Sequence, residues 1–351
     1  MEHGISPIIK VVDYCNFDCY FCRYHTKKDG NKMSIELYKT IIENTIKFNL
    51  ANNLKVVSMD FHGGEPLLWG LDNFKQAVAF QQEMKGRYPT ITFSNHVQTN
   101  GFLLDEQWID FFKKNNFVVG VSIDGPDSCN FHGAGERNKL VLENIRQLDL
   151  AGCFSGILSV ITDKHKGLAD DYYDFIVNNN IHSIGFIYCV YEDDAGITVD
   201  NGILSEFLIR LFDRYYYGDY QLNIREFEDV MRKILNKQTI SCIYCDHQNC
   251  GHSLSITPQG DVAFCDTYTI GKDILGNISD SDFFQITQSP LYKSLVEDTK
   301  KSIDLVCKDC EIHDICGGGC YRNTLPNGKN SFCETYKTLY PHIKKTIEHL
   351  L

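Results

Sequence analysis

A chain of 351 residues, 43% of them hydrophobic and 23% charged, has the composition of a folded globular protein. This composition excludes wholesale disorder and a fibrous repeat. At about 150 residues per domain, the length predicts roughly two domains. The formal net charge of −12, from 34 basic and 46 acidic residues, argues against nucleic acid or an anionic membrane as the partner.

The sequence contains no signal for export or membrane insertion. No apolar stretch of signal-peptide length follows a basic region at the start, and no segment approaches about 18 consecutive apolar residues. We therefore expect the chain to stay in the cytoplasm. Because thiols are kept reduced there, the 15 cysteines are expected to include metal ligands or catalytic groups rather than a disulfide framework.

Residues 1–200 alternate apolar, β-branched runs with amphipathic stretches, which is the pattern of a parallel sheet with helical crossovers. Six strands with five helices between them are expected, namely strand 8–12, helix 35–48, strand 54–61, helix 71–85, strand 91–98, helix 105–115, strand 117–123, helix 139–150, strand 156–162, helix 168–178 and strand 183–190. Six strand–helix units are too few for a closed eight-stranded barrel but fit an α/β fold of the partial TIM-like (β/α)6 type. In such a fold the active site lies at the C-terminal strand ends.

The rest of the chain has a different character. Residues 201–240 are expected to form helices that bridge to a second module, residues 241–351, where turn-rich segments separate most of the cysteines. The final residues, from Tyr336 onward, predict a closing helix. The predicted domains are therefore the partial barrel (1–200), the helical bridge (201–240) and the cysteine-rich module (241–351).

Three cysteines follow the first predicted strand in the pattern C-x3-C-x2-C. Cys15, Cys19 and Cys22 place three thiols on one short loop, and thiolates are the ligands of iron–sulfur clusters. A structural zinc site closes with four ligands, whereas a 4Fe–4S cluster held by three leaves one iron free for a small molecule. The alternative is three incidental or zinc-binding thiols.

This loop, with Phe21 before its last cysteine and the sequence HGGEP at residues 62–66, resembles the radical S-adenosylmethionine (SAM) superfamily. The resemblance implies that SAM chelates the open iron and that the GGEP stretch, Gly63 to Pro66, binds its amino group. Gly63 and Gly64 would let the backbone approach the ligand closely, and Glu65 would balance the ammonium.

Two later strand ends match positions that this family uses near the SAM ribose and carboxylate. They are VQTNG at 97–101 and VSIDGP at 121–126, and the candidates are Asn100, Ser122 and Asp124. Arg137 is a further candidate, as a partner of the SAM carboxylate. The alternative for these residues is turn chemistry at strand ends.

The C-terminal cysteine string resembles the SPASM domain, which holds two auxiliary 4Fe–4S clusters. The resemblance assigns one cluster to Cys250, Cys265, Cys320 and an upstream cysteine, for which Cys245 is preferred and Cys242 is the alternative. It assigns the other cluster to Cys307, Cys310, Cys316 and Cys333. Three 4Fe–4S clusters would then use 11 of the 15 cysteines. Cys153 and Cys189 are expected to be core thiols, and a zinc ribbon is the alternative reading of the string.

Within this family the sequence is most similar to anaerobic sulfatase-maturating enzymes, which oxidise Ser or Cys to formylglycine, and to maturases of ribosomal peptides. The resemblance implies that Asp266, directly after Cys265, is the base that accepts the substrate proton. His62 stands where the sulfatase-maturating enzymes usually have Gln, so general peptide modification is preferred and formylglycine formation is one branch of it.

The implied reaction is reductive cleavage of SAM to a 5'-deoxyadenosyl radical, which abstracts hydrogen from a peptide side chain or backbone carbon and leads to oxidation or crosslinking. The expected partners are a substrate peptide or protein and an electron donor such as flavodoxin or ferredoxin. Because the first strand begins within ten residues, a separate leader-recognition protein is a further expected partner. The alternatives are an enzyme acting on a small molecule and an electron-transfer protein without radical chemistry.

Overall fold

The computed structural model describes residues 4–22, 24, 27–129, 135–190, 198–237, 239, 250–266 and 273–350, with the backbone alone for residues 300–305. Cys242 and Cys245 lie outside these residues. Within the described ranges, no helix combines the length and apolarity needed to span a membrane. None of the described cysteines forms a disulfide.

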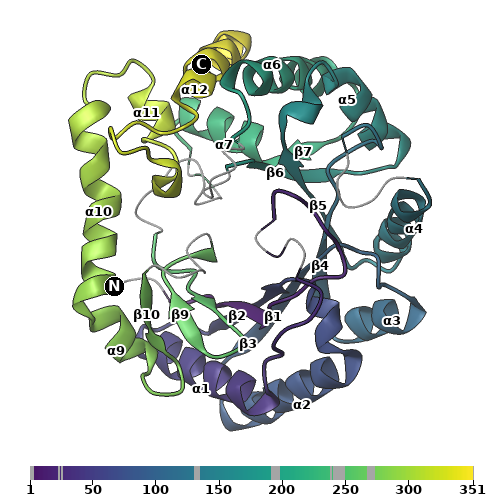
Figure 1. Cartoon of the computed structure of the whole chain (residues 1–351), viewed down its shortest axis with the longest axis vertical. Helices are drawn as coiled ribbons and strands as arrows, with labels where there is room; N and C mark the ends of the chain where they lie inside the picture. Colours follow the sequence, from purple (N-terminus) through teal and green to yellow (C-terminus); the bar gives the residue numbers. More distant parts are fainter. Residues whose placement is uncertain are drawn as a thin grey trace. The chain divides into compact units, whose positions relative to one another are not determined.

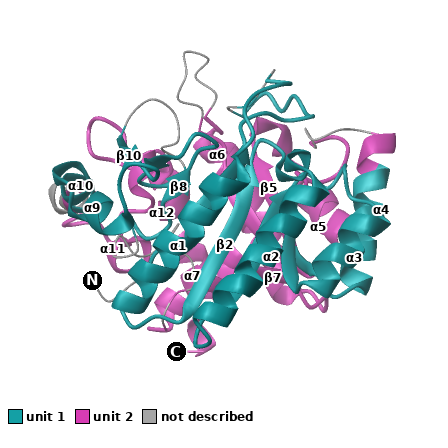
Figure 2. Cartoon of the chain, turned by 90° about the horizontal axis from the view of Figure 1, so that it is seen from below, with its two compact units in different colours: residues 1–121, 139–155, 250–296 teal, residues 122–138, 156–249, 297–351 magenta. Residues whose placement is uncertain are grey.

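The chain divides into two compact units, each assembled from segments that are distant in sequence (Figure 2). Unit 1 comprises residues 1–121, 139–155 and 250–296, and unit 2 comprises residues 122–138, 156–249 and 297–351. Both units therefore draw on the predicted barrel and on the predicted cysteine-rich module. The predicted boundaries at residues 200 and 240 stay a prediction.

Unit 1 is built on a sheet in the order β10-β9-β8-β1-β2-β3-β4. The four predicted strands are present and run parallel, while β8 joins β1 in parallel and is followed by two antiparallel strands. The strands are β1 (Ile8–Val12), β2 (Val56–Gly63), β3 (Thr92–Thr99), β4 (Phe117–Ser122), β8 (Ser255–Ile256), β9 (Asp261–Ala263) and β10 (Ile274–Asn277). The last three have two to four residues each, too few to show an alternating pattern in the sequence.

The helices of unit 1 include α1, α2 and α3, which lie along one side of β1–β4 (Figure 1). Ser34 caps α1 by accepting a hydrogen bond from the Leu37 N–H, and the helix buries Tyr38, Ile42 and Ile46, which lie on one face of it. The helices with most of their residues in this unit are α1 (Ile35–Ala51), α2 (Leu71–Arg87), α3 (Glu106–Lys114), α4 (Glu136–Leu150) and α9 (Phe283–Gln288), with the short helix η1 (Pro66–Trp69) after β2.

An aromatic cluster forms the centre of unit 1. The ring of Phe61 on β2 packs against Trp69, Phe74 and Phe117, with centroids 4.9 to 6.3 Å apart. The Trp69 indole N–H also donates to the Met33 carbonyl at 2.7 Å. Close packing of this kind fixes side chains in single positions, so it holds the end of β2 in place.

Unit 2 contains three parallel strands, β5 (Phe154–Ile161), β6 (Ser183–Tyr188) and β7 (Asn223–Ile224). The first two were predicted. The third interrupts the region expected to be helical throughout, because two residues give no periodic signal. The helices with most of their residues here are α5 (Ala169–Asn178), α6 (Asn201–Tyr217), α7 (Arg225–Ile234), α10 (Pro290–Val306), α11 (His313–Cys316) and α12 (Cys333–Thr346).

The closing helix α12 docks on α6 through polar contacts. Asn201, the first residue of α6, donates from Nδ2 to the Ser331 carbonyl at 3.0 Å. Its Oδ1 accepts from the Thr335 N–H at 3.2 Å and from the Thr335 hydroxyl at 2.8 Å. The Thr335 N–H lies in the first turn of α12, where backbone donors have no partner inside the helix. Asn201 therefore caps α12 from another helix.

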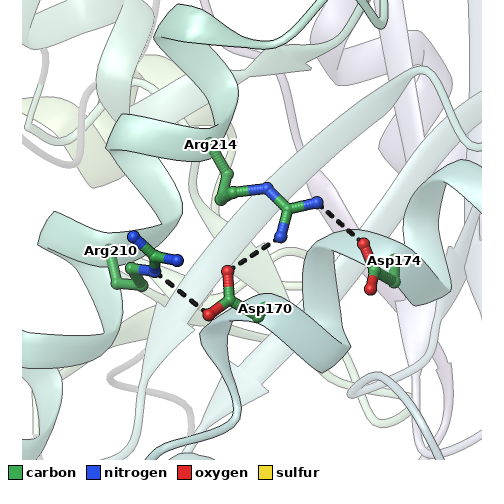
Figure 3. A network of polar contacts seen from close by, with 4 residues as sticks. All are labelled: Asp170, Asp174, Arg210 and Arg214. Carbon is green, nitrogen blue, oxygen red and sulfur yellow. Dashed lines mark hydrogen bonds and ion pairs between the residues drawn. The ribbon is translucent and has the colours of Figure 1, made fainter.

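Helices α5 and α6 are joined at the surface by an ion-pair network (Figure 3). Arg214 bridges Asp170 and Asp174 at 2.8 Å each, and Arg210 reaches Asp170 at 3.0 Å. The Arg214 guanidinium also lies over the Tyr173 ring, 4.4 Å from its centroid. Because these charges are largely exposed, the network adds little to the free energy of unfolding.

Candidate functional site

The three-cysteine loop follows β1 directly. Cys19 is buried, and Cys15 and Cys22 are half-buried. The Cys22 N–H donates to the Cys19 carbonyl at 2.9 Å, and the Phe17 N–H points at the Cys15 sulfur, 3.4 Å away. The pKa of Cys15 is raised to about 12, mainly by burial and also by the charges of Glu65, Cys19 and Cys22, while the hydrogen bond from Phe17 has the opposite effect. The three thiols are thus close enough to influence one another.

This donor set fits an iron–sulfur cluster. Among the described residues, no group of three or more His, Cys, Asp or Glu side chains converges as ligands of one metal ion do. A 4Fe–4S cluster binds its thiolates at separate corners, so three spaced cysteines on one loop suit it better than a mononuclear zinc ion does. Binding would displace the thiol protons, because thiolates are the ligands.

Gly63 and Gly64, at the end of β2, bring that strand against the backbone of the cysteine loop. The Gly64 N–H donates to the Val12 carbonyl and the Glu65 N–H to the Tyr14 carbonyl, both at 3.0 Å. A Cβ atom on Gly63 would overlap the Val12 carbonyl, and one on Gly64 would overlap the Tyr14 carbonyl. The close approach that needs two glycines is therefore made to the chain's own backbone.

The Glu65 carboxylate is fully buried and held by three hydrogen bonds. Its Oε1 accepts from the Thr99 hydroxyl at 2.7 Å and from the Leu67 N–H at 3.0 Å, and its Oε2 accepts from the Asn100 N–H at 2.8 Å. These donors fix the orientation of the carboxylate, whose negative charge suits an ammonium group. Pro66 follows as the first residue of η1.

Asn100, at the end of β3, contacts the cysteine loop directly. Its Nδ2 donates to the Asn16 Oδ1 at 2.8 Å and lies 3.8 Å from the Cys15 sulfur. Its Oδ1 accepts from the Phe102 N–H at 3.1 Å. Phe21, on the same loop, is half-buried and packs edge-on against Tyr20. The structure thus gathers Cys15, Glu65 and Asn100 within unit 1.

The three other candidates for SAM binding belong to unit 2. Asp124 is fully buried and its Oδ1 accepts from the Val160 N–H at 2.9 Å, so its carboxylate joins two strand ends. Ser122 is half-buried at the end of β4, and Arg137 is exposed in the first turn of α4. Contact of these three with SAM stays a prediction.

Sequence reasoning missed a polar cluster around the Asp124 backbone. The His165 Nε2 lies 3.0 Å from the Asp124 carbonyl. The Ser159 hydroxyl donates to the Ile123 carbonyl at 2.6 Å and contacts the Tyr172 hydroxyl at 2.5 Å. These groups satisfy buried carbonyls at the ends of β4 and β5. Their residue types follow no motif that would have identified them.

A second missed cluster lies in unit 1 and includes the predicted base. Lys10, in the middle of β1, is 3% exposed and forms an ion pair with Asp266. His62 is the register partner of Lys10 on β2, and the Lys10 Nζ lies 3.4 Å from its Nδ1. The signal available in the sequence was the lysine itself, since a charge within the apolar strand IIKVV is buried only when it is paired.

The same cluster fixes the protonation state of His62. Burial, helped by the Lys10 charge, lowers the pKa of His62 to about 4, so the ring is neutral near pH 7. The Gly63 N–H donates to Nδ1 at 2.9 Å. Because Nδ1 accepts a hydrogen bond, the ring proton lies on Nε2. His62 therefore presents an N–H donor in the cluster that contains Asp266.

Four cysteines of the C-terminal string line one cavity in unit 2. They are Cys307, Cys310, Cys316 and Cys333, the set that the sequence resemblance assigned to one auxiliary cluster. Burial raises the pKa of Cys316 to about 12, and the charges of its neighbouring thiols act in the same direction. Four thiols around one small cavity provide a complete ligand set for a 4Fe–4S cluster.

The other predicted set is only partly described. Cys250 and Cys265 lie in unit 1 and Cys320 in unit 2, while Cys242 and Cys245 are outside the described residues, so this assignment stays a prediction. Cys153 and Cys189 are each 4% exposed, which confirms that they are core thiols. Cys129 is also buried, and its Sγ lies 3.5 Å from the carbonyls of Asp124 and Pro126.

Comparison with protein families finds two matches along the chain. Residues 9–174 match the radical SAM superfamily, and residues 245–311 match the SPASM domain, described as an iron–sulfur cluster-binding domain. The first match covers the segment that carries the three-cysteine loop and the GGEP stretch. The second covers Cys250, Cys265, Cys307 and Cys310.

Two curated relatives are anaerobic sulfatase-maturating enzymes. The chain is 28% identical to the cysteine-type enzyme of Clostridium novyi, over 96% of this chain and 94% of the relative. It is also 28% identical to the serine-type enzyme of Bacteroides thetaiotaomicron, over 94% of this chain and 86% of the relative. The two relatives thus belong to different types of this enzyme, one cysteine-type and one serine-type.

Among solved structures, native anSMEcpe with bound AdoMet and Cp18Cys peptide is similar over nearly the whole chain. The TM-score is 0.84 at 25% sequence identity, covering 99% of this chain and 100% of that chain. Together with the radical SAM match, this likeness confirms the predicted α/β partial barrel with a C-terminal SPASM domain.

Proposed function

We propose that this chain is a radical SAM enzyme with a SPASM domain, related to the anaerobic sulfatase-maturating enzymes. It abstracts hydrogen from a side-chain or backbone carbon of a substrate peptide and thereby oxidises or crosslinks the peptide. The observation that carries this proposal is that the buried Glu65 is joined to the three-cysteine loop by its own N–H, which donates to the Tyr14 carbonyl, and by Asn100, which contacts both the Glu65 carboxylate and the Cys15 sulfur. This arrangement offers thiolates for a cluster and a carboxylate for an ammonium group in one unit.

Cys15, Cys19 and Cys22 would hold a 4Fe–4S cluster which, with SAM, supplies the one-electron chemistry that activates a carbon–hydrogen bond. Glu65 would bind the SAM amino group, because its orientation is already fixed by three donors. Phe21, Asn100, Ser122, Asp124 and Arg137 are the further candidates for SAM binding. Cys245, Cys250, Cys265 and Cys320 would hold a second cluster, and the cysteines of the unit 2 cavity a third.

Asp266 would accept the proton that the substrate loses during oxidation. Lys10 supports this role because the ion pair favours the charged carboxylate and fixes its position. A substrate hydroxyl or thiol would give up its proton to such a base, which is what formation of formylglycine from Ser or Cys requires. That reaction is the narrower alternative, and the neutral His62 N–H donor is the feature by which this chain departs from it.

We place the enzyme in the cytoplasm, where a flavodoxin or ferredoxin would supply electrons. A separate leader-recognition protein would deliver the peptide if the substrate is a ribosomal peptide precursor. The electron donor follows from the chemistry of the proposed reaction, because reductive cleavage of one SAM would take up one electron, which a substrate oxidised by two electrons would give back after losing its hydrogen atom.

The first test is SAM cleavage by the anaerobically purified enzyme with dithionite as reductant. We expect the triple variant Cys15→Ala, Cys19→Ala, Cys22→Ala to lose 5'-deoxyadenosine formation and about four irons per chain, as one 4Fe–4S cluster contains. Cys153→Ala, which removes a core thiol, is the matched control and should retain both. Equal 5'-deoxyadenosine formation by the triple variant and the wild type would refute the proposal.

The second test addresses the substrate. The Cp18Cys peptide of the structural neighbour and versions with Ser or Ala at the target position would be incubated with enzyme, SAM and reductant, and their masses measured. Conversion of the Cys or Ser peptide but not the Ala peptide supports the formylglycine branch. Turnover of a sugar or alcohol, with every peptide unchanged, would favour the small-molecule alternative.

A further inference from the structure

The cavity in unit 2 that gathers four cysteines also contains a cation. Besides the thiols and two uncharged residues, its lining includes His313 of α11 and Lys337 of α12. No carboxylate is among the described residues that line it. Lys337 is exposed to solvent and also lines the cavity, so this side chain borders both the cavity and water.

The helix places Lys337 beside the cysteines. Cys333 is the first residue of α12, and Lys337 follows it by four positions, so that both side chains lie on the same face of the helix. Tyr336 and Leu339 are buried on the neighbouring face, which anchors this part of α12. The lysine stem is therefore directed along the rim of the cavity by a helix that packs firmly elsewhere.

The charge of Lys337 acts on two of the four thiols. Burial raises the pKa of Cys307 and Cys333, and the ammonium of Lys337 opposes that effect on both. The exposed carboxylate of Glu334 acts on Cys333 in the opposite direction. The positive charge of Lys337 thus acts on two of the thiol ligands from the rim of the cavity. The negative charge of Glu334, which is not part of the cavity lining, acts on one of them.

A 4Fe–4S cluster with four thiolates is an anion, and reduction adds one more negative charge. A fixed positive charge nearby stabilises the reduced state more than the oxidised state, and neighbouring charge and solvent exposure are known determinants of cluster potential. We propose that Lys337 raises the reduction potential of the cluster bound by Cys307, Cys310, Cys316 and Cys333. This inference rests on the proposed function, in which those cysteines bind a cluster.

The effect should be moderate and dependent on salt. A tenfold change in the equilibrium between oxidised and reduced cluster corresponds to about 59 mV for one electron, and we expect a shift of up to this size. Because Lys337 borders water, dissolved ions screen it, with a Debye length of about 10 Å at 0.1 M salt and about 3 Å at 1 M. The shift should therefore decrease as the salt concentration rises.

The test is a redox titration of the full-length enzyme followed by electron paramagnetic resonance. The first cluster is removed by the triple alanine variant of Cys15, Cys19 and Cys22, so that auxiliary signals are observed alone. In this background Lys337→Met is expected to lower one midpoint potential. Lys337→Arg should restore it, and Lys344→Met, which removes an exposed lysine farther along α12, should leave it unchanged.

Two results would overturn the inference in different ways. If Lys337→Met retains the iron content of its parent and every midpoint potential stays the same at low salt, Lys337 does not tune the cluster. If the simultaneous change of Cys307, Cys310, Cys316 and Cys333 to Ala leaves the iron content unchanged, the four cysteines do not bind a cluster, and the assignment on which the inference rests is wrong. Iron analysis therefore separates failure of the inference from failure of the proposed function.

Discussion

The ammonium of Lys10 on β1 forms an ion pair with the carboxylate of Asp266, which follows β9. The lysine is 3% exposed and the aspartate 35% exposed. The parallel pairing of β1 with β8 and the antiparallel pairing of β8 with β9 bring the two residues together. A buried ammonium is costly unless it is paired, so the position of Asp266 is tied to the stability of the sheet.

Replacement of Lys10 by Met keeps Asp266 but removes the ion pair that holds its carboxylate in place, so this variant tests whether the position of Asp266 matters. We expect peptide oxidation to fall about 10²-fold, the cost typical of a misplaced catalytic group, while the peptide-independent formation of 5'-deoxyadenosine stays near the wild-type rate. Lys10→Arg should recover part of the loss. Lys55→Met, at an exposed lysine before β2, is the control. Both rates can be measured by liquid chromatography with mass spectrometry, and equal losses in both would contradict a role through Asp266.

The protonation state of His62 gives a prediction about pH. Burial lowers its pKa to about 4, below the value near 6.5 of an unfolded chain. Between these two values the unfolded state binds more protons, so this residue reduces the stability of the fold as pH falls from about 6.5 towards 4. Nitrogen-15 NMR of histidine-labelled protein should show His62 neutral and protonated at Nε2 from pH 8 to 5. A midpoint near 6.5 would refute the assignment.

Much of the fold could be predicted because its elements are long enough to show a period. The strands from β1 to β6 have five to eight residues, and the sequences of the helices between them show an apolar stripe with a helical period. The cysteine loops could be predicted because ligand spacing is preserved in the sequence. In contrast, β7 and β8 have two residues each, and a two-residue strand is specified by its partners rather than by its own pattern.

The candidate site could be predicted only in part for the same reason. The three-cysteine loop and Glu65 each lie in a short motif that can be recognised in the sequence, whereas Lys10 and Asp266 meet through the register of three short strands. Gly63 and Gly64 were expected to let the backbone approach SAM closely, which stays a prediction, and the structure shows a close approach to the Val12 and Tyr14 carbonyls. A sequence indicates that a glycine is needed, and only the fold indicates which atom it avoids.

The link between α6 and α12 predicts that loss of its polar contacts costs more unfolding free energy than loss of an exposed ion pair in unit 2. Asn201→Ala removes the cap of the Thr335 N–H, and we expect the free energy of unfolding to fall by about 1–2 kcal/mol, as for other helix caps. Arg210→Ala removes an exposed ion pair of Figure 3 and should cost less than about 1 kcal/mol. Urea unfolding followed by circular dichroism measures both. Equal costs would contradict the capping role of Asn201.

The contact between Gly64 and the cysteine loop predicts that one added methyl group disrupts cluster binding. In Gly64→Ala the Cβ would overlap the Tyr14 carbonyl, so the loop that carries Cys15 has to move, and we expect the iron content to fall by about one 4Fe–4S cluster per chain. Gly86→Ala, in α2 with no atom within 4 Å of the added Cβ, is the control, and it should raise stability by roughly 0.5–1 kcal/mol because alanine favours a helix. Iron analysis and thermal unfolding distinguish the variants. Full iron content in Gly64→Ala would show that the loop binds its cluster without the close approach of β2.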